Sequence, residues 1–352
     1  MRRRWPFILP AVTAALLLSA APALACGGLI GPNGAVNLLR TTTLAGYHGG
    51  VEHYVTSFEF AGGGGAFGSL TPLPGVPTSV EKGGDWTLQR LIRETQPQLF
   101  FAEDALRAAA PAAGSAEEIM KVRIDALDIT VLRGGAAEVG QWAKDHGFRL
   151  PPDAPEVLEF YASRSPIFLA AAFDGAAAQE RGQAVGDGTP VHITIPTPNP
   201  WVPLRILALG KTGDEQVQAD VYLLTDITPV MLPAPSGRNG ISLQHSAAAT
   251  DSLLSDLRSD RGMEWVPAKA WLTQVTVDAS ARQLSYDLAI DASGQGTPSR
   301  VQAGLDIPSI SYGTGLAMGR LLVTLAAIAL GFVLILRLVT AGNGGVRPAA
   351  GG

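Results

Sequence analysis

The feature that most constrains this chain is an uncharged apolar run near its C-terminal end. Leu321–Leu336 contains no charged residue, and its 16 residues would rise about 24 Å as a helix, slightly less than a hydrocarbon core of ~30 Å. Arg320 and Arg337 flank the run and can extend their aliphatic stems toward opposite headgroup layers. The sequence therefore predicts a transmembrane helix over residues 316–340 and a short cytoplasmic tail over 341–352. The alternative interpretation is a buried helix of a soluble protein.

The N-terminal residues have the three parts of a secretory signal peptide. Met1–Arg4 is cationic, Phe7–Leu18 is mostly apolar, and Ala23–Ala25 fits the small-residue cleavage pattern. Cleavage after residue 25 predicts export of the rest of the chain, with an uncleaved signal anchor as the alternative. Arg337 and Arg347 follow the apolar run without acidic neighbours, which favours a cytoplasmic C-terminus. We expect a single-pass plasma-membrane protein whose N-terminal ectodomain lies outside the cytoplasm, in the periplasm or at the cell surface.

The chain has one cysteine, so it cannot form an intramolecular disulfide. Cys26 directly follows the predicted cleavage site, a position that suggests lipid attachment. Lipoprotein signals normally place Leu three residues before the cysteine, where this chain has Ala23. A free thiol and an intermolecular bridge are the alternatives to lipidation.

Composition narrows the set of partners. The net charge is −5, charged residues make up 16% of the chain, and no block of basic residues occurs. This balance gives no electrostatic support for nucleic-acid binding or for recognition of anionic lipids. The expected partners are the membrane, through the C-terminal helix, and envelope proteins or polymers. The ectodomain is predicted over residues 26–291, with a possible subdivision near 105–116 or 229–250, followed by a Gly/Ser/Pro-rich stalk over 292–315.

Periodicity predicts an α+β ectodomain that is rich in strands, with a few mid-chain helices, plus the C-terminal transmembrane helix. Asp85 is a candidate N-cap for the first helix, and Pro229–Ser246 reads as a loop. A phase shift in the alternation of residues 120–131 indicates a bulge near Asp125. Helices are expected from Trp86 to Pro97 and over Ala136–His146, Pro155–Ser163 and Asp251–Arg258. Strands are expected over Val51–Phe60, Ala66–Leu70, Ile167–Phe173, Val191–Ile195, Leu204–Leu209, Val217–Leu224, Trp271–Val277 and Leu284–Ile290.

The sequence predicts no catalytic, cofactor-binding or metal-binding residues. His48 and His53 are close, but a third ligand is lacking, and a spacing of five on one strand would place the two rings on opposite faces. His245, Ser246 and Asp251 are neighbours in sequence, which says little about the geometry of a catalytic triad. The glycines at 62–65 lack the Lys and Ser/Thr of a phosphate-binding loop.

One segment remains as a candidate site. The prolines of Ile195–Pro203 hold the chain extended, and its tryptophan is rigid and amphipathic. One interpretation is a partner-binding loop formed by Pro198, Pro200, Trp201 and Pro203. The alternative is a stiff crossover whose tryptophan packs in the core.

Several short motifs carry a family resemblance. They are Cys26-Gly27-Gly28, Leu70–Pro74, the block Ala126–Phe173 with Trp142 and Tyr161, Pro200–Ile206 and Trp271–Thr273. With these motifs the chain resembles the bacterial family called domain of unknown function 2330. The resemblance implies an exported, sometimes membrane-anchored envelope protein, and it brings no activity with it. We expect a non-catalytic binding or envelope-associated module. An unrecognised envelope hydrolase and a structural subunit of a membrane complex are the alternatives.

Overall fold

The computed structural model describes residues 28–32, 34–35, 41–59, 67–95, 119–182 and 188–306. These residues belong to one compact unit that ends at Asp306. The predicted signal peptide, Cys26, the glycines at 62–65, the 105–116 segment, the helix at 316–340 and the tail at 341–352 lie outside the described residues. Within the described part of the chain, none of the helices has the length and apolar character needed to cross a bilayer.

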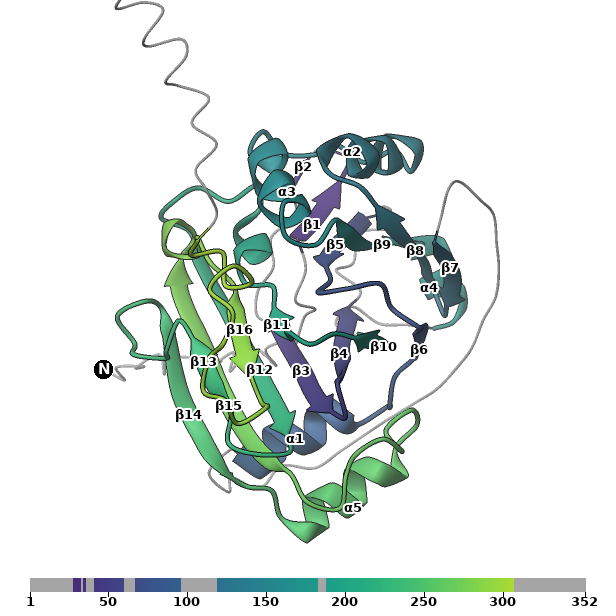
Figure 1. The fold of residues 1–352 in the computed structure, drawn as a ribbon. Coiled ribbons are helices and arrows are strands. Elements are labelled where there is room, and N and C mark those ends of the chain that lie inside the picture. Colours follow the sequence, from purple (N-terminus) through teal and green to yellow (C-terminus); the bar gives the residue numbers. More distant parts are fainter. Residues whose placement is uncertain are drawn as a thin grey trace, which may run out of the picture. The chain divides into compact units, whose positions relative to one another are not determined.

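A seven-stranded sheet forms the centre of the unit, in the order β14-β15-β12-β3-β4-β10-β6 (Figure 1). Its strands are β3 (Thr41–His48), β4 (Val51–Glu59), β6 (Ser79–Lys82), β10 (Gly188–Pro196), β12 (Gln216–Thr225), β14 (Ile241–Ala248) and β15 (Trp271–Ser280). The pair β12–β3 is parallel, and the other neighbours in this sheet are antiparallel.

Two smaller antiparallel sheets accompany the central one. The six-stranded sheet has the order β2-β1-β5-β9-β8-β7, and the three-stranded sheet has the order β11-β16-β13. Their strands are β1 (Gly28–Gly31), β2 (Gly34–Ala35), β5 (Phe67–Pro72), β7 (Met120–Ile124), β8 (Leu127–Arg133), β9 (Ile167–Phe173), β11 (Trp201–Val202), β13 (Val230–Leu232) and β16 (Leu288–Asp291). The predicted α+β class, rich in strands, is confirmed.

The helices lie beside the sheets. Helices α1 and α5 pack together on the central sheet, and α2 and α3 lie beside the six-stranded sheet (Figure 1). The described helices are α1 (Thr87–Thr95), α2 (Ala136–Asp145), α3 (Ala154–Ala162), α4 (Gly175–Glu180) and α5 (Asp251–Ser259), with 3-10 turns η1 (Arg205–Ala208) and η2 (Ala281–Gln283). Leu91 of α1 and Leu257 of α5 are fully buried against Leu44 and Val55 of the sheet, which explains the apolar face of each helix.

The start of α1 corrects one prediction. The cap is Asp260, from after α5, and not Asp85. The Asp260 carboxylate accepts hydrogen bonds from the backbone amides of Asp85 and Trp86, each at 3.1 Å, and from the Thr87 hydroxyl at 2.7 Å. A carboxylate supplied from a remote loop thus satisfies the free amides at this helix end and ties α1 to the end of α5.

Three further local predictions were wrong. The phase shift near residue 125 is a tight hairpin between β7 and β8, with Asp125 at a φ of 53°, and not a bulge. The apolar run Leu204–Leu209 contains the 3-10 turn η1, because Asp287 accepts hydrogen bonds from the amides of Leu204 and Arg205 and bends the chain. The predicted loop Pro229–Ser246 contains β13 and most of β14.

Residues 292–306, which were predicted to begin a stalk, instead pack on the unit. Ala303 is fully buried, and its carbonyl accepts a hydrogen bond from the Asp287 amide at 3.0 Å. The Gln302 carbonyl accepts a hydrogen bond from Arg164. Residues 229–250 mark no domain boundary, since they supply strands to two of the three sheets within the one unit.

Candidate functional site

The proline-rich crossover between β10 and η1 is mostly buried. Trp201 is fully buried and pairs with Ala289 in the three-stranded sheet. Its ring stacks on Tyr161, with centroids 5.8 Å apart. This arrangement corresponds to the core alternative for Trp201. Of the four residues predicted to form a partner-binding loop, Pro200, Trp201 and Pro203 are buried, and Pro198 is exposed, together with its neighbour Asn199.

The crossover is fixed to the tip of the β3–β4 hairpin. The tip consists of Gly49 and Gly50, whose φ angles of 59° and 83° favour glycine. The Thr197 amide donates a hydrogen bond to the Gly50 carbonyl at 3.1 Å, and the Tyr47 hydroxyl donates to the Thr197 carbonyl at 3.0 Å. The exposed Pro198 therefore directly follows Thr197, whose backbone amide and carbonyl are both hydrogen-bonded to the hairpin.

Acidic residues gather around the same end of the sheet. Burial raises the pKa of the Tyr47 hydroxyl, and the nearby carboxylates of Glu52, Asp291 and Asp226 raise it further. His48 Nδ1 lies 2.7 Å from Asp226 Oδ1, and both side chains are nearly half exposed. We call the exposed part of this region, residues 48–50, 198–199 and 226–227, the hairpin-tip surface.

Glu52 is the buried acid of this region. Its side chain is fully buried, opposite Tyr47 on β3 and Ile195 on β10. Neither carboxylate oxygen has a hydrogen-bond partner of normal geometry among the described residues. Burial raises the pKa of Glu52 from 4.5 to about 8, although the nearby Trp201 backbone lowers it in part. Glu52 is therefore protonated at neutral pH, because burial without a partner disfavours its charged form.

His53 of β4 and His192 of β10 form a pair on the face of the sheet opposite Glu52. His53 Nδ1 and His192 Nε2 are 3.0 Å apart, and the Trp265 ring stacks on His53 with centroids 4.0 Å apart. Burial lowers the pKa of His53 to about 3 and that of His192 to about 4. Both rings are therefore neutral at pH 7, and one of them donates its N–H to the other. Gly46 makes room for the indole, because a Cβ atom there would lie 2.0 Å from it.

Sequence reasoning missed this pair, since His192 follows His53 by 139 residues and no local pattern joins them. The two histidines weighed as a metal pair are on different strands, with His48 on β3 and His53 on β4. The described residues contain no group of three or more side chains arranged to hold a metal ion. Ser246, considered beside His245 for a catalytic triad, instead accepts a hydrogen bond from the Trp271 indole at 2.9 Å.

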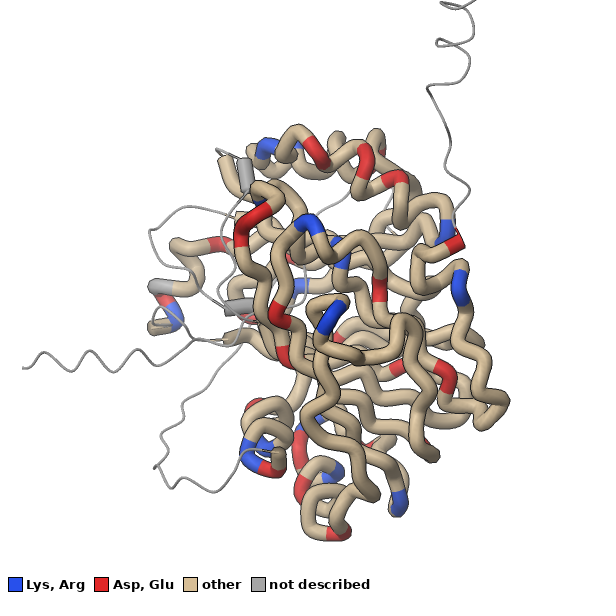
Figure 2. The backbone as a smooth tube through the Cα atoms, turned by 90° about the vertical axis from the view of Figure 1, so that its left-hand side faces the viewer, with Lys and Arg blue, Asp and Glu red and all other residues tan. Residues whose placement is uncertain are grey.

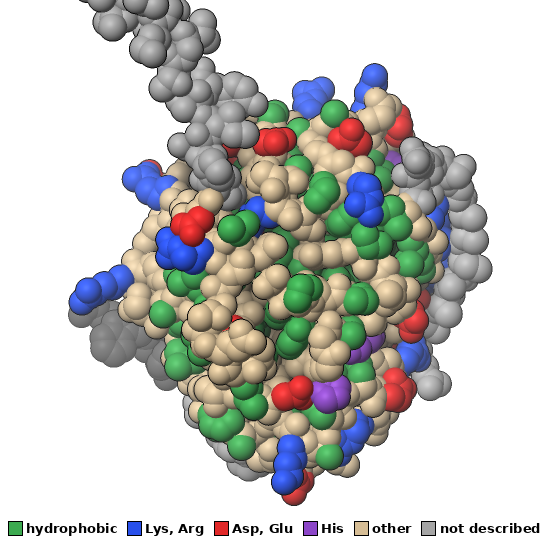
Figure 3. Space-filling model, in the orientation of Figure 1, with side chains coloured by type: hydrophobic (Ala, Val, Ile, Leu, Met, Phe, Trp, Pro, Cys, Tyr) green, Lys and Arg blue, Asp and Glu red, His purple; other side chains and the backbone are tan. Residues whose placement is uncertain are grey.

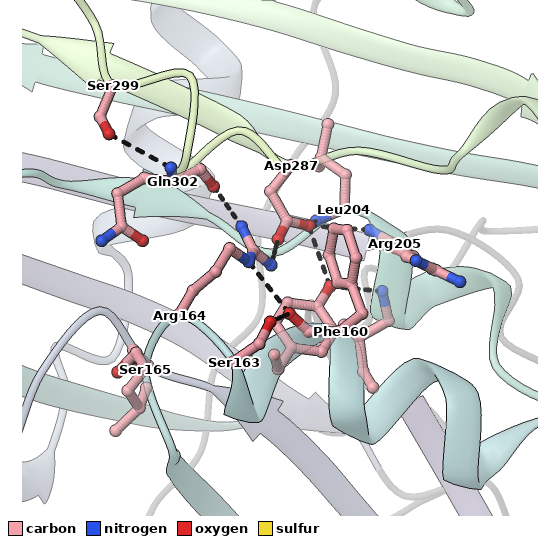
Figure 4. A network of polar contacts seen from close by, with 12 residues as sticks. Phe160, Ser163, Arg164, Ser165, Leu204, Arg205, Asp287, Ser299 and Gln302 are labelled. Carbon is pink, nitrogen blue, oxygen red and sulfur yellow. Dashed lines mark hydrogen bonds and ion pairs between the residues drawn. The ribbon is translucent and has the colours of Figure 1, made fainter. Parts of the chain in front are cut away.

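A third polar cluster centres on a buried ion pair (Figure 4). Arg164 Nη2 and Asp287 Oδ2 are 2.6 Å apart, and both side chains are at most 1% exposed. The other Asp287 oxygen accepts hydrogen bonds from the Tyr161 hydroxyl at 2.9 Å and the Leu204 amide at 2.7 Å. Because every charge here is paired and hydrogen-bonded, the cluster joins α3, η1 and the loop before β16, and we assign it to folding rather than chemistry.

Comparison with protein families gives a match over most of the chain. Residues 20–291, more than half of the chain, match the family DUF2330, described as an uncharacterized protein conserved in bacteria. The chain belongs to this family. A comparison of the DUF2330 protein with functionally curated proteins finds no match.

Solved structures of baculovirus P35 resemble this DUF2330 protein weakly. The crystal structure of baculovirus P35 shares 10% identity over 71% of this chain and 96% of that chain, with a TM-score of 0.39. A mutated P35 after caspase cleavage shares 8% identity over 73% of this chain and 98% of that one, with a TM-score of 0.38. No functional argument follows from similarity at this level.

Among the three regions, the hairpin-tip surface is the candidate functional site of the DUF2330 protein. The histidine pair and the Arg164–Asp287 cluster are buried, whereas the hairpin-tip surface joins exposed residues from three separate segments. Charged residues are scattered along the described backbone (Figure 2). The face of the molecule in Figure 3 is mostly uncharged, with single charged side chains spread over it.

Proposed function

We propose that this DUF2330 protein is a membrane-anchored, extracytoplasmic binding module that uses the hairpin-tip surface to hold an envelope protein with a basic segment. The signal-like N-terminus and the uncharged run at residues 321–336 support the location. Asp226 on this surface is negatively charged, and its ion pair among the described residues is with His48. A negative charge at a binding surface favours a positively charged segment of the binding protein.

One observation carries the proposal: an exposed Pro198–Asn199 tip stands on a rigid, buried base. Thr197 is bound to the hairpin, and Trp201 is locked in the three-stranded sheet. Proline restricts the backbone of the exposed tip as well. A loop that is already ordered loses little conformational entropy when it binds, so a small surface of this kind can give useful affinity.

Photo-crosslinking tests the binding surface. A photoreactive amino acid replaces Pro198 in the full-length protein in native membranes, and Pro152, another exposed proline, is replaced in the matched control. We expect a discrete protein adduct from position 198 that is absent from position 152 and is lost when Asp226→Lys is added. Identical adducts from the two positions, or an adduct that Asp226→Lys leaves unchanged, would contradict the proposal.

The location is tested separately by alkaline washing of membranes and by protease treatment of intact cells or spheroplasts. We expect the protein to stay in the membrane pellet and residues 28–306 to be digested from outside. Release by the wash, or protection from protease, would rule out the anchored, exported arrangement without bearing on the hairpin-tip surface.

A further inference from the structure

Strand β14 forms one edge of the central sheet, at the left of Figure 1. It pairs with β15 on one side, and no described strand pairs with it on the other. Alternate residues of an edge strand turn their amide and carbonyl groups away from the sheet, where they can pair with another chain. The outer edge of β14 is therefore a potential pairing surface.

The composition of β14 does little to prevent such pairing. Natural edge strands are commonly protected by charged residues, by proline or by a bulge. The strand Ile241–Ala248 contains no Asp, Glu, Lys, Arg or Pro, and its Leu243 is 49% exposed. It does have a bulge between Leu243 and His245, which divides it into two straight segments, 241–243 and 245–248.

The charges flanking β14 favour one particular partner. Arg238 lies three residues before the strand and Asp251 three residues after it, and both are exposed. Neither side chain forms an ion pair or hydrogen bond with the described residues of the same chain. The strand thus has one positive and one negative end, each without a counter-charge in the described part of one copy.

We infer that β14 pairs in antiparallel fashion with β14 of a second copy of this chain, about a two-fold axis between Gln244 and His245. In this register residues 241–243 lie opposite residues 246–248 of the second copy, and Gln244 and His245 at the two bulged centres stay unpaired. Arg238 of each copy then approaches Asp251 of the other copy, which gives two ion pairs across the interface. A parallel arrangement would place like charges together, and a two-fold axis gives the closed, self-complementary interface typical of dimers.

This inference does not depend on the proposed function. The hairpin-tip surface is formed by residues at the β3–β4 turn, in the crossover and directly after β12, whereas the dimer uses the edge strand β14. Dimerisation would present two hairpin-tip surfaces at a fixed separation, which raises avidity for a partner with repeated binding sites.

A charge-exchange cycle tests the register. The purified full-length chain in detergent is studied by sedimentation velocity as wild type, as Arg238→Glu, as Asp251→Arg and as the double variant. We expect a wild-type dimer at micromolar concentration, an increase in the dimer dissociation constant of about tenfold or more in each single variant, and recovery in the double variant. A wild type that stays monomeric at about 100 μM, which would also be the result if another part of the same chain covered β14, overturns the inference.

A second pair of variants tests the strand edge itself. Leu243→Lys places a charge on the edge, and Val301→Lys makes the same change at a residue with the same 49% exposure away from β14. We expect Leu243→Lys to abolish the dimer and Val301→Lys to leave it intact, with both variants folded by circular dichroism. A dimer that survives both Leu243→Lys and Arg238→Glu uses another surface and would overturn the inference.

Discussion

The buried acid Glu52 makes the stability of this protein depend on pH in a predictable direction. Its pKa is raised from 4.5 to about 8 in the folded protein, because the carboxyl group is fully buried and lacks a hydrogen-bond partner of normal geometry among the described residues. Below pH 4.5 the group is protonated in both the folded and the unfolded chain. As the pH rises from 4.5 to about 8, the unfolded chain loses this proton and the folded chain keeps it, so folding becomes less favourable.

The size of the effect follows from the two pKa values. The difference between 4.5 and about 8 corresponds to a loss of about 5 kcal/mol in the free energy of unfolding, reached above pH 8. At pH 7 the loss is about 3 kcal/mol, which is a large share of the ~5–15 kcal/mol that stabilises a typical domain. These are upper values, since opening around Glu52 in the folded protein would let the group ionise at lower cost.

Glu52→Gln isolates this contribution, because an amide of nearly the same shape cannot ionise. The measurement is urea unfolding of the wild type and the variant between pH 4 and pH 9. We expect the variant to gain stability relative to the wild type as the pH rises through the interval from 4.5 to about 8, and the difference to level off above it. Glu81→Gln, at an exposed position on β6, controls for the loss of one carboxylate. A difference between Glu52→Gln and wild type that is constant with pH, or that falls as pH rises, would refute the reasoning.

Two other predictions concern packing and the buried ion pair. Arg164→Met should lower the free energy of unfolding by about 3–5 kcal/mol, because Asp287 would be left charged and buried. The same change at Arg300, whose pair with Asp306 is about half exposed, should cost under ~1 kcal/mol; equal losses in chemical denaturation would contradict this contrast. Gly46→Ala should cost about 1–3 kcal/mol and alter the near-ultraviolet circular dichroism of Trp265, since the new methyl group would overlap the indole. Gly140→Ala within helix α2, where a Cβ atom would make only an ordinary 3.8 Å contact with Leu150, should instead stabilise by about 0.5–1 kcal/mol, and a loss of stability there would contradict this contrast.

Elements whose signal is local could be predicted from the sequence. Helices α2 and α3 bury the faces that their periodicity indicates, including Trp142 and Tyr161. Strands β4, β9 and β12 were also found, because alternating or continuous apolar residues mark strands that are buried on one or both faces. The loop prediction for β14 failed for the opposite reason. An edge strand with mostly exposed, small and polar residues lacks the apolar pattern that identifies a buried strand.

The functional candidates depended on contacts that sequence patterns cannot reveal. Asp287 bends the chain at Leu204 from 83 residues away, and Asp260 caps α1 from beyond α5. The same limit applies to Glu52, because its sequence context does not distinguish it from an ordinary carboxylate. Its unusual pKa comes from its burial in the folded protein, and nothing in Val51–Glu59 alone signals that burial.

These long-range contacts also determine how the binding proposal must be tested. The crossover holds Trp201 in the core and is fixed beyond it by the Asp287 carboxylate, so deleting the crossover or replacing Trp201 would remove part of the fold along with any binding surface. A loss of partner after such a change would therefore not distinguish misfolding from a lost contact. Pro198 and Asp226 differ from Trp201 in being exposed, so changes there alter the surface while the buried base remains. The structure thus separates the tip of the segment, where binding can be tested, from its base, where substitution tests only stability.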